Sequence, residues 1–287
     1  MSKTYILYNP YAGNQDGESK AKELNKLYTD SLLEYFDITK IKDYKAFFNS
    51  LNPLDEIIVC GGDGTLNRFI NEVYDLKIKN NVLYYATGNG NDFLRDLGKE
   101  VGARPFRINN YIKDLPTVTV NGKIYRFLNG IGFGIDGYCC EVGDQLREKN
   151  KKPNYTIIAI KGLLYGYKPT AAKITVDDKT KNYKKVWIAP TMYGRYYGGG
   201  MMPAPMQSRN DRKKQVSIAA IHSAGKLHTL CVFPSIFKGT HVKHSSMVDV
   251  IKGHHIIVEF DRPVALQIDG ETILDVRKYE VKSKQDQ

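Results

Sequence analysis

Three short apolar segments in the first 110 residues each end in a turn that contains glycine, and this pattern limits the possible folds. The segments are residues 5–8, 57–60 and 82–85, with helical spacing at 20–35 and 66–74 between them. The alternation predicts a parallel β-sheet with crossover helices, because parallel strands cannot be joined by a tight hairpin. Ligands of such sheets bind where strands end and helices begin.

The three glycine turns, at residues 9–13, 61–65 and 88–92, have the composition of a phosphate site. Backbone N–H groups and the positive ends of the following helices attract phosphates, and glycine lets the backbone approach the ligand. Each turn alone would be ordinary turn geometry. Asp63 and Asp92 add acids to two of them, which suits magnesium coordination. The absence of GxxxxGK[ST] excludes a P-loop NTPase.

After about residue 115 the pattern changes to short alternating strands. An Asn121–Gly122 turn joins residues 118–120 to 124–127, which is typical of a β-hairpin. Further strand-like runs follow at 173–176, 186–188, 216–221 and 255–260. This second half therefore predicts an antiparallel β-sandwich.

The net charge of +11 favours an anionic partner, such as an acidic membrane surface or polyphosphate. Zinc-finger spacing and aromatic–glycine RNA-binding motifs are missing, so we expect no nucleic-acid partner. We also expect neither a signal peptide nor a membrane span. The four cysteines lack disulfide or zinc spacing and indicate a cytoplasmic protein, and the six scattered histidines indicate no metal site.

Five motifs in order resemble the diacylglycerol kinase catalytic family, in its soluble bacterial branch. They are YNPYAG, GGDGTLN, TGNGNDFLRDLG, FLNGIGFGID and QIDGE. NAD kinases and 6-phosphofructokinases share the GGDGT turn, so the resemblance depends on all five motifs together. It implies an α/β nucleotide-binding domain with a parallel sheet of the NAD kinase and phosphofructokinase type, at residues 1–125. It also implies an antiparallel β-sandwich domain for the lipid at 126–274, with 275–287 returning to the first domain.

The resemblance implies an ATP- and Mg²⁺-dependent lipid kinase, a transferase of phospholipid biosynthesis that converts diacylglycerol to phosphatidic acid. Asn89 stands where the family has threonine, and Arg68 stands where an acid is common. Carried over by position, the ATP-binding residues would be Asn9, Pro10, Tyr11, Ala12, Gly13, Thr39, Gly62, Asp63, Gly64, Thr65, Leu66, Asn67, Arg68, Asn89 and Asp92.

The Asp269–Gly270–Glu271 turn would carry the proton chemistry. Phosphoryl transfer needs alignment, charge neutralisation and a base for the incoming hydroxyl. Either acid of the turn could be that base. The resemblance favours Glu271, with Asp269 beside it near the metal and Asp63 in the catalytic magnesium network. From the turn alone, a hairpin with a solvent-facing glutamate is the better interpretation. The other four motifs, which occur in the family's order, favour the catalytic role instead.

The resemblance further implies a structural magnesium at Ser208, Asp211 and Lys213. Arg212 and Lys214 depart from the family pattern there, and a charged hairpin tip is the alternative.

We therefore expect a cytoplasmic lipid kinase that associates reversibly with anionic membranes and acts on a lipid alcohol. Two alternatives are a catalytically weak regulatory protein that binds nucleotide or lipid, and an NAD kinase. The acceptor lipid stays open at this stage, and so does the oligomeric state, for which a homodimer is one candidate.

Overall fold

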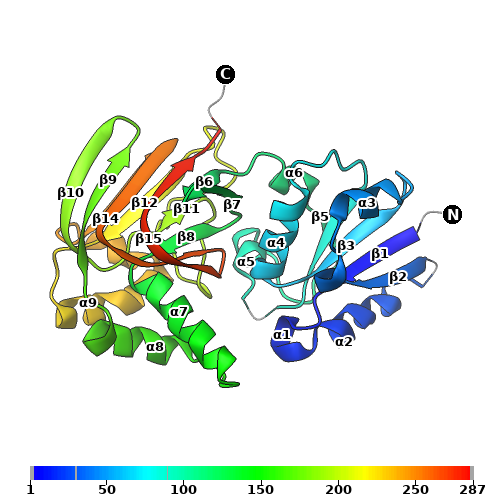
Figure 1. Cartoon of the computed structure of the whole chain (residues 1–287), viewed down its shortest axis with the longest axis horizontal. Coiled ribbons are helices and arrows are strands. Elements are labelled where there is room, and N and C mark those ends of the chain that lie inside the picture. The colour runs from blue at the N-terminus through cyan, green and yellow to red at the C-terminus, as the bar shows by residue number, and fades with distance from the viewer. Residues whose placement is uncertain (1–2, 30, 89, 285–287) are drawn as a thin grey trace. The chain divides into compact units, whose positions relative to one another are not determined.

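The computed structural model describes residues 3–29, 31–88 and 90–284, and the chain divides into two compact units, Met1–Leu115 and Pro116–Gln287 (Figure 1). The first contains a parallel sheet and the second an antiparallel one, so the predicted fold class is confirmed. Within the described ranges, no helix has both the length and the apolar character that crossing a membrane requires.

The first unit is built on a five-stranded sheet in the order β2-β1-β3-β4-β5, in which only the β5 pairing is antiparallel. Its strands are β1 (Lys3–Tyr8), β2 (Leu32–Asp37), β3 (Glu56–Gly61), β4 (Asn81–Ala86) and β5 (Phe106–Arg107). Its helices are α1 (Ala12–Gln15), α2 (Gly17–Lys22), η1 (Glu23–Lys26), η2 (Ile38–Lys40), α3 (Tyr44–Asn49), α4 (Asp63–Val73), α5 (Asp92–Asp96) and α6 (Asn109–Ile112).

Helices cover both faces of this sheet, because strand side chains alternate between the faces. Ile6 of β1 and Ile58 of β3 pack in a buried cluster with Leu24, on the face that α2 and η1 cover. On the other face, the ring of Tyr5 lies 6.1 Å from that of Phe47 in α3. Both faces of the central strands are thus buried, as expected for a parallel sheet.

One sequence prediction in this unit is wrong. The single helix expected over residues 20–35 ends early, and Leu32–Asp37 instead forms β2, paired in parallel with β1. Its six residues are half-buried or exposed, because β2 is an edge strand, so they lack the continuous apolar run of β1 and β3. The helical part of this segment is limited to α2 and η1, which end at Lys26.

The second unit contains a ten-stranded antiparallel sheet, with the path β13-β12-β11-β8-β14-β15-β6-β7 and the β9–β10 hairpin attached to β14. Its strands are β6 (Thr117–Val120), β7 (Lys123–Arg126), β8 (Gly130–Phe133), β9 (Thr170–Val176), β10 (Lys179–Val186), β11 (Thr191–Met192), β12 (Val216–Ile221), β13 (Val248–Gly253), β14 (His255–Ile268) and β15 (Glu271–Lys282). Its helical segments are α7 (Ile135–Glu148), α8 (Tyr155–Lys161), the π-helix η3 (Gly162–Gly166), α9 (Lys226–Val232), η4 (Phe233–Lys238) and η5 (Thr240–Lys243).

The long strand β14 organises this unit. Its first part pairs with β9 and its last part with β8, and the register with β15 shifts between these two parts. Such irregularities bend a strand, which lets one strand serve two parts of a curved sheet. In the core, the ring of Phe133 stacks on Phe260 at 3.9 Å and meets Tyr279 edge-on at 5.5 Å.

The division between the units falls after Leu115 rather than after residue 125. The reason is strand pairing: β6 pairs with β15, with Val120 opposite Tyr279, so the β6–β7 hairpin extends the second sheet. Strand β15 pairs with β14 and β6. Residues 275–284, which were expected to return to the first domain, therefore belong to the second unit. Residues 285–287 lie outside the described residues.

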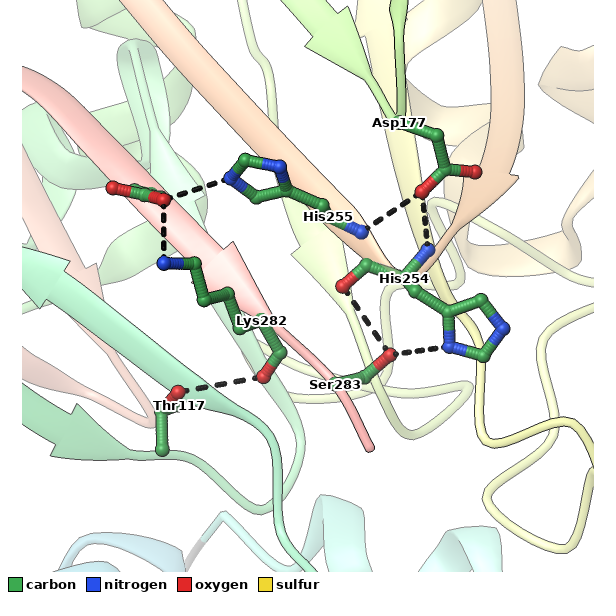
Figure 2. Close-up of polar contacts among 7 residues, drawn as sticks. Thr117, Asp177, His254, His255, Lys282 and Ser283 are labelled. Carbon is green, nitrogen blue, oxygen red and sulfur yellow. Dashed lines mark hydrogen bonds and ion pairs between the residues drawn. The ribbon is translucent and has the colours of Figure 1, made fainter. Parts of the chain in front are cut away.

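Polar contacts tie down the end of β15 and the start of β14 (Figure 2). The carboxylate of Asp177 accepts the backbone N–H groups of His254 and His255 at 2.9 and 3.0 Å. The hydroxyl of Thr117 donates to the carbonyl of Lys282 at 3.4 Å. These contacts hold the two strand ends that lie farthest from the turn joining β14 to β15.

Phe133→Ala should destabilise the second unit by about 3–5 kcal/mol, because it removes a buried ring that packs on two others. Urea unfolding can be followed through Trp187, the single tryptophan, which is buried in this unit. Ile124→Ala, at an exposed position of β7, is the control and should change stability little. A loss below about 1 kcal/mol for Phe133→Ala would contradict its place in the core.

Candidate active site

The carboxyl ends of four parallel strands meet at one edge of the first sheet. Tyr8 of β1 lies opposite Asp37 of β2 and Cys60 of β3, and Gly61 lies opposite Ala86 of β4. The three glycine turns therefore start at this common edge, as predicted. The segment after β2 starts there too and carries Thr39, an exposed residue whose hydroxyl donates to Asp37 at 2.6 Å.

Two of the glycine turns meet backbone to backbone. A Cβ atom on Gly88 would lie 2.4 Å from the Cα of Gly62, and one on Gly61 would lie 2.4 Å from the Cβ of Thr65. The N–H groups of Thr87 and Gly88 both donate to the carbonyl of Gly61, at 2.9 and 3.3 Å. These glycines are therefore required for the packing of the two turns, and they leave bare backbone beside the first turn of α4.

The first turn is tied to the second by Asn9. Its side-chain amide donates to the hydroxyl of Thr65 at 2.8 Å, and its amide oxygen accepts the N–H of Tyr11 at 3.0 Å. The ring of Tyr11 is 70% exposed at the surface. Asn9 thus fixes the position of Thr65 in α4 relative to the segment that follows β1.

Sequence reasoning missed Lys20, a cation at the same edge. Its ammonium donates to the carbonyl of Thr87 at 3.2 Å, and a Cβ on Gly13 would lie 2.6 Å from its nitrogen. The sequence signal was weak, because Lys20 is one of many lysines and its partner is 67 residues away. A basic residue in the helix that follows a glycine turn was the only available hint.

Asp63 links the β3–α4 turn to α5. Its carboxylate accepts the backbone N–H groups of Asp92 at 2.7 Å and Phe93 at 3.3 Å, which are the first two residues of α5. Asp92 itself is buried. The structure brings both predicted acids together and gives Asp63 a holding role that the sequence did not reveal.

The remaining predicted ATP-binding residues differ in exposure. The side chains of Leu66 and Asn67 are buried, and the amide oxygen of Asn67 accepts from Asn71 at 3.2 Å. Arg68 is exposed on the same helix. Asn89 lies outside the described residues.

In the second unit, Asp269 is a buried residue at the turn between β14 and β15. Its carboxylate accepts the backbone N–H groups of Leu128, Asn129 and Gly130, the last two at 2.8 and 2.9 Å. Glu271, by contrast, is exposed as the first residue of β15. The predicted acids thus share one turn, but only Glu271 presents its side chain at the surface.

Arg209 and Gln267 are two buried polar residues of this region to which the sequence assigned no role. The guanidinium of Arg209 donates to the carbonyl of Leu128 at 3.2 Å and to the side-chain oxygen of Asn129 at 3.1 Å. It thereby holds the same segment that Asp269 binds. Gln267 contacts the Asp269–Gly270–Glu271 turn itself, through the N–H of Gly270.

Asp136, another residue that sequence reasoning did not assign, lies in the first turn of α7 and is 8% exposed. Its carboxylate accepts a hydrogen bond from Gln267 at 2.9 Å. Burial disfavours the charged form and raises the pKa of Asp136 from its usual 3.8 to about 6, although the bond from Gln267 acts in the opposite direction. Asp136 is therefore a buried acid beside the turn of the two predicted catalytic acids.

The residues predicted to hold a structural magnesium form a hydrogen-bonded turn. The N–H of Asp211 donates to the carbonyl of Ser208, and the N–H of Lys213 donates to the Asp211 carboxylate, both at 3.1 Å. Nowhere in the described ranges do three or more acidic, histidine or cysteine side chains gather as metal ligands would. Arg212 and Lys214 lie beside this turn, and the structural magnesium at Ser208, Asp211 and Lys213 stays a prediction.

Two family profiles together match nearly the whole chain. The family described as "Diacylglycerol kinase catalytic domain" matches residues 3–117. The family described as "YegS C-terminal NAD kinase beta sandwich-like domain" matches residues 129–280, which is more than half of the chain. These matches agree with the resemblance carried by the five motifs.

Individual relatives point the same way. The chain is 25% identical to the Bacillus subtilis protein named "Putative lipid kinase YtlR", with 94% of each chain covered. It is 24% identical to a Bacillus subtilis "Diacylglycerol kinase", covering 94% of this chain and 90% of that protein. A crystal structure of a "putative diacylglycerol kinase" from Bacillus anthracis Sterne has a TM-score of 0.68 at 21% identity, covering 99% of this chain and 93% of that one. This last likeness concerns the fold.

The buried acid Asp136 should make stability depend on pH. Its pKa is higher in the folded chain than in the unfolded one, so ionisation costs folding free energy as pH rises through about 6. The amide of Asp136→Asn cannot ionise. The free energy of unfolding of this variant, relative to that of wild type, should therefore be higher at pH 7.5 than at pH 4.5 by on the order of 2 kcal/mol. Urea unfolding at the two pH values measures this difference.

Asp178→Asn, the same substitution at an exposed turn position of the second unit, is the matched control. Its stability should follow the wild-type pH dependence. If the free energies of unfolding of wild type and Asp136→Asn changed equally with pH, the result would contradict a raised pKa of Asp136.

Proposed function

Because this chain belongs to the diacylglycerol kinase catalytic family, we propose that it is an ATP- and Mg²⁺-dependent kinase that phosphorylates the free hydroxyl of diacylglycerol. The observation that carries the proposal is the edge of the first sheet. There Gly61, Gly62 and Gly88 pack with no side chains between them, beside the first turn of an 11-residue helix. Exposed backbone N–H groups at a helix start are a favourable place for phosphate.

The first unit would hold the nucleotide. The backbone at Gly62 and Gly64, with the hydroxyl of Thr65, would bind the phosphates, and Asn9 keeps that hydroxyl in position. Lys20 would add a positive charge to balance the triphosphate. Tyr11 and Thr39 are exposed on the segments after β1 and β2, so they are suited to contacts with the nucleoside.

The acids at this edge fit a magnesium ion carried by ATP. Asp63 and Asp92 are held together by the hydrogen bond from the N–H of Asp92, next to the glycine turns. Magnesium prefers carboxylate and phosphate oxygens, and when bound it would neutralise charge on the phosphates. Asp63 would then combine two tasks, holding the start of α5 and facing the metal.

The second unit would supply the lipid site and the base. In the reaction, the lipid hydroxyl oxygen forms a bond to the γ-phosphorus, the bond to the β-phosphate oxygen breaks, and ADP leaves. Glu271 would accept the hydroxyl proton, because its side chain is exposed. Asp269 is less suited to this task, since its two carboxylate oxygens accept three backbone N–H groups. It would act by holding the turn.

Glu271→Gln should lower kcat for lipid phosphorylation by about 100-fold or more, because the amide cannot accept the proton. Transfer of radiolabel from ATP with Mg²⁺ to mixed micelles measures this, with diacylglycerol, monoacylglycerol, sphingosine, ceramide and phosphatidylglycerol as separate acceptors. The matched control is Glu259→Gln, at an exposed position of β14 that should leave activity unchanged.

Full activity of Glu271→Gln would remove Glu271 from the chemistry. Phosphorylation of NAD in detergent-free buffer, with no transfer to any lipid, would instead favour an NAD kinase. Binding of ATP without turnover on any of these acceptors would favour a regulatory protein.

We also propose that α8 and η3 dock on an anionic membrane surface. Tyr155, Ile157 and Ile160 of α8, together with Tyr165 of η3, are exposed apolar or aromatic side chains on consecutive helical turns. Lys161 is exposed among them, and the exposed lysines 149, 151 and 152 precede α8. Apolar insertion combined with lysines that attract acidic headgroups is the usual design of an interfacial helix.

Replacing Ile157 and Ile160 together with aspartate should weaken binding to phosphatidylglycerol-containing vesicles by about tenfold or more, because two apolar contacts are lost and two negative charges are added. Vesicle sedimentation measures the binding. Ile124→Asp, at an exposed position of β7, serves as the control and should bind like wild type. Unchanged binding of the double variant would rule out this surface, and equal binding to neutral vesicles would rule out the contribution of charge.

A further inference from the structure

A buried amide bridge links α7 to the turn between β14 and β15. The side chain of Gln267 is 3% exposed. Its Nε2 donates to the Oδ2 of Asp136 at 2.9 Å, and its Oε1 accepts the backbone N–H of Gly270 at 2.6 Å. An ionised carboxylate can only accept and a backbone N–H can only donate, so only one orientation of the amide satisfies both partners.

The two anchors of the bridge belong to closely packed elements. A Cβ on Gly137 of α7 would lie 1.9 Å from the carbonyl of Ala265 in β14, so the helix backbone lies directly on the strand. A Cβ on Gly132 would lie 1.4 Å from the Oδ2 of Asp136 and 2.8 Å from the Nε2 of Gln267. Glycine at 132 therefore makes room for the bridge, and its surroundings leave little freedom to rearrange.

The turn that receives the bridge has two residues, Asp269 and Gly270, between the paired residues Ile268 and Glu271. Both turn residues have positive φ, 47° and 97°, as in the tight hairpin turns that favour Asn-Gly and Asp-Gly. Asp269 is held by the amides of the 128–130 segment, and Gly270 is held by Gln267. Each residue of the turn thus has its own anchor, and Glu271 follows directly.

We infer that Gln267 and Asp136 are positioning residues for Glu271: the bridge holds the N–H of Gly270 and so sets the direction in which β15 presents the Glu271 carboxylate. This inference rests on the proposed function, in which Glu271 is the base. A base must lie within hydrogen-bond distance of the proton it takes, so a freely moving turn would lower the rate of transfer. Binding of ATP involves other residues and should not depend on the bridge.

The bridge can be tested without any lipid, through hydrogen exchange of the Gly270 amide. Gly270 is exposed, so its N–H should be protected chiefly by the bond to Gln267. Gln267→Met keeps the length of the side chain but removes donor and acceptor, and should speed exchange by about tenfold. The matched control is Gln207→Met, which removes another buried amide of the same unit, bonded to Tyr193 and Ser217, and should leave Gly270 protected.

A double variant reverses the polarity of the bridge. In Asp136→Asn with Gln267→Glu, the new amide donates to one glutamate oxygen, and the N–H of Gly270 donates to the other. Protection of Gly270 should return to within about threefold of wild type, and a merely structural loss of packing would not be repaired in this way. Unchanged exchange in Gln267→Met would overturn the bridge.

Steady-state kinetics test whether the bridge affects phosphoryl transfer. Gln267→Met should lower kcat for lipid phosphorylation by about tenfold with an unchanged KM for ATP, and the double variant should recover most of kcat. Faster exchange with an unchanged kcat would overturn the positioning role. A wild-type chain that phosphorylates no lipid would overturn the proposed function, while the exchange data would still decide whether Gln267 holds the turn.

Discussion

The carboxylate of Asp269 receives three backbone N–H groups from the 128–130 segment, and the arrangement around Glu271 depends on this contact. A buried carboxylate is costly unless hydrogen bonds replace its lost water, and a buried N–H without a partner is costly as well. The carboxylate of Asp269 and the three backbone N–H groups therefore supply each other with the hydrogen bonds that burial requires. Arg209 completes the arrangement by donating to the carbonyl of Leu128 and the side chain of Asn129, so the segment is held through both its donors and its acceptors.

The first unit uses the same device. Asp63 belongs to a glycine turn, and its carboxylate accepts the N–H groups at the start of α5, about thirty residues further along the chain. In both units, the acid that a sequence reader would assign to catalysis holds backbone groups from another segment. The acids therefore define the shape of each site before they take any part in chemistry. Bond formation to a metal or a proton must then use the lone pairs that remain.

The sequence predicted the parts of the fold that local patterns encode. Strands β1, β3 and β4 are continuous apolar runs that end at glycine, and their turns share one edge because parallel strands must end on the same side. Strand β2 was missed because its residues are half-buried or exposed and carry no such run. The division after Leu115 was missed because the β6–β7 hairpin owes its place to pairing with β15, near the other end of the chain.

Of the candidate site, the sequence supplied the acids and glycines but not their partners. Lys20 and Arg209 belong to none of the five motifs, and Gln267 belongs to one without a role assigned to it. They bond to residues 67, 80 and 131 positions away, respectively. Such contacts follow from the packing of complete elements, which no local pattern in one sequence reports. Glu271 is exposed and Asp269 is buried, and this difference likewise arises only when the turn between β14 and β15 has folded.

The bond between Asp269 and Asn129 spans 140 positions, and this has a consequence for the order in which the protein is made. During synthesis, the first unit has all of its strands and its core once residue 115 has left the ribosome, and domains generally fold as units in that order. The 128–130 segment must wait until β14 and the following turn have been translated. A nascent chain would therefore acquire a folded glycine edge well before the carboxylate of Glu271 exists. Under the proposed function, such an incomplete chain would bind nucleotide but could not transfer its phosphate.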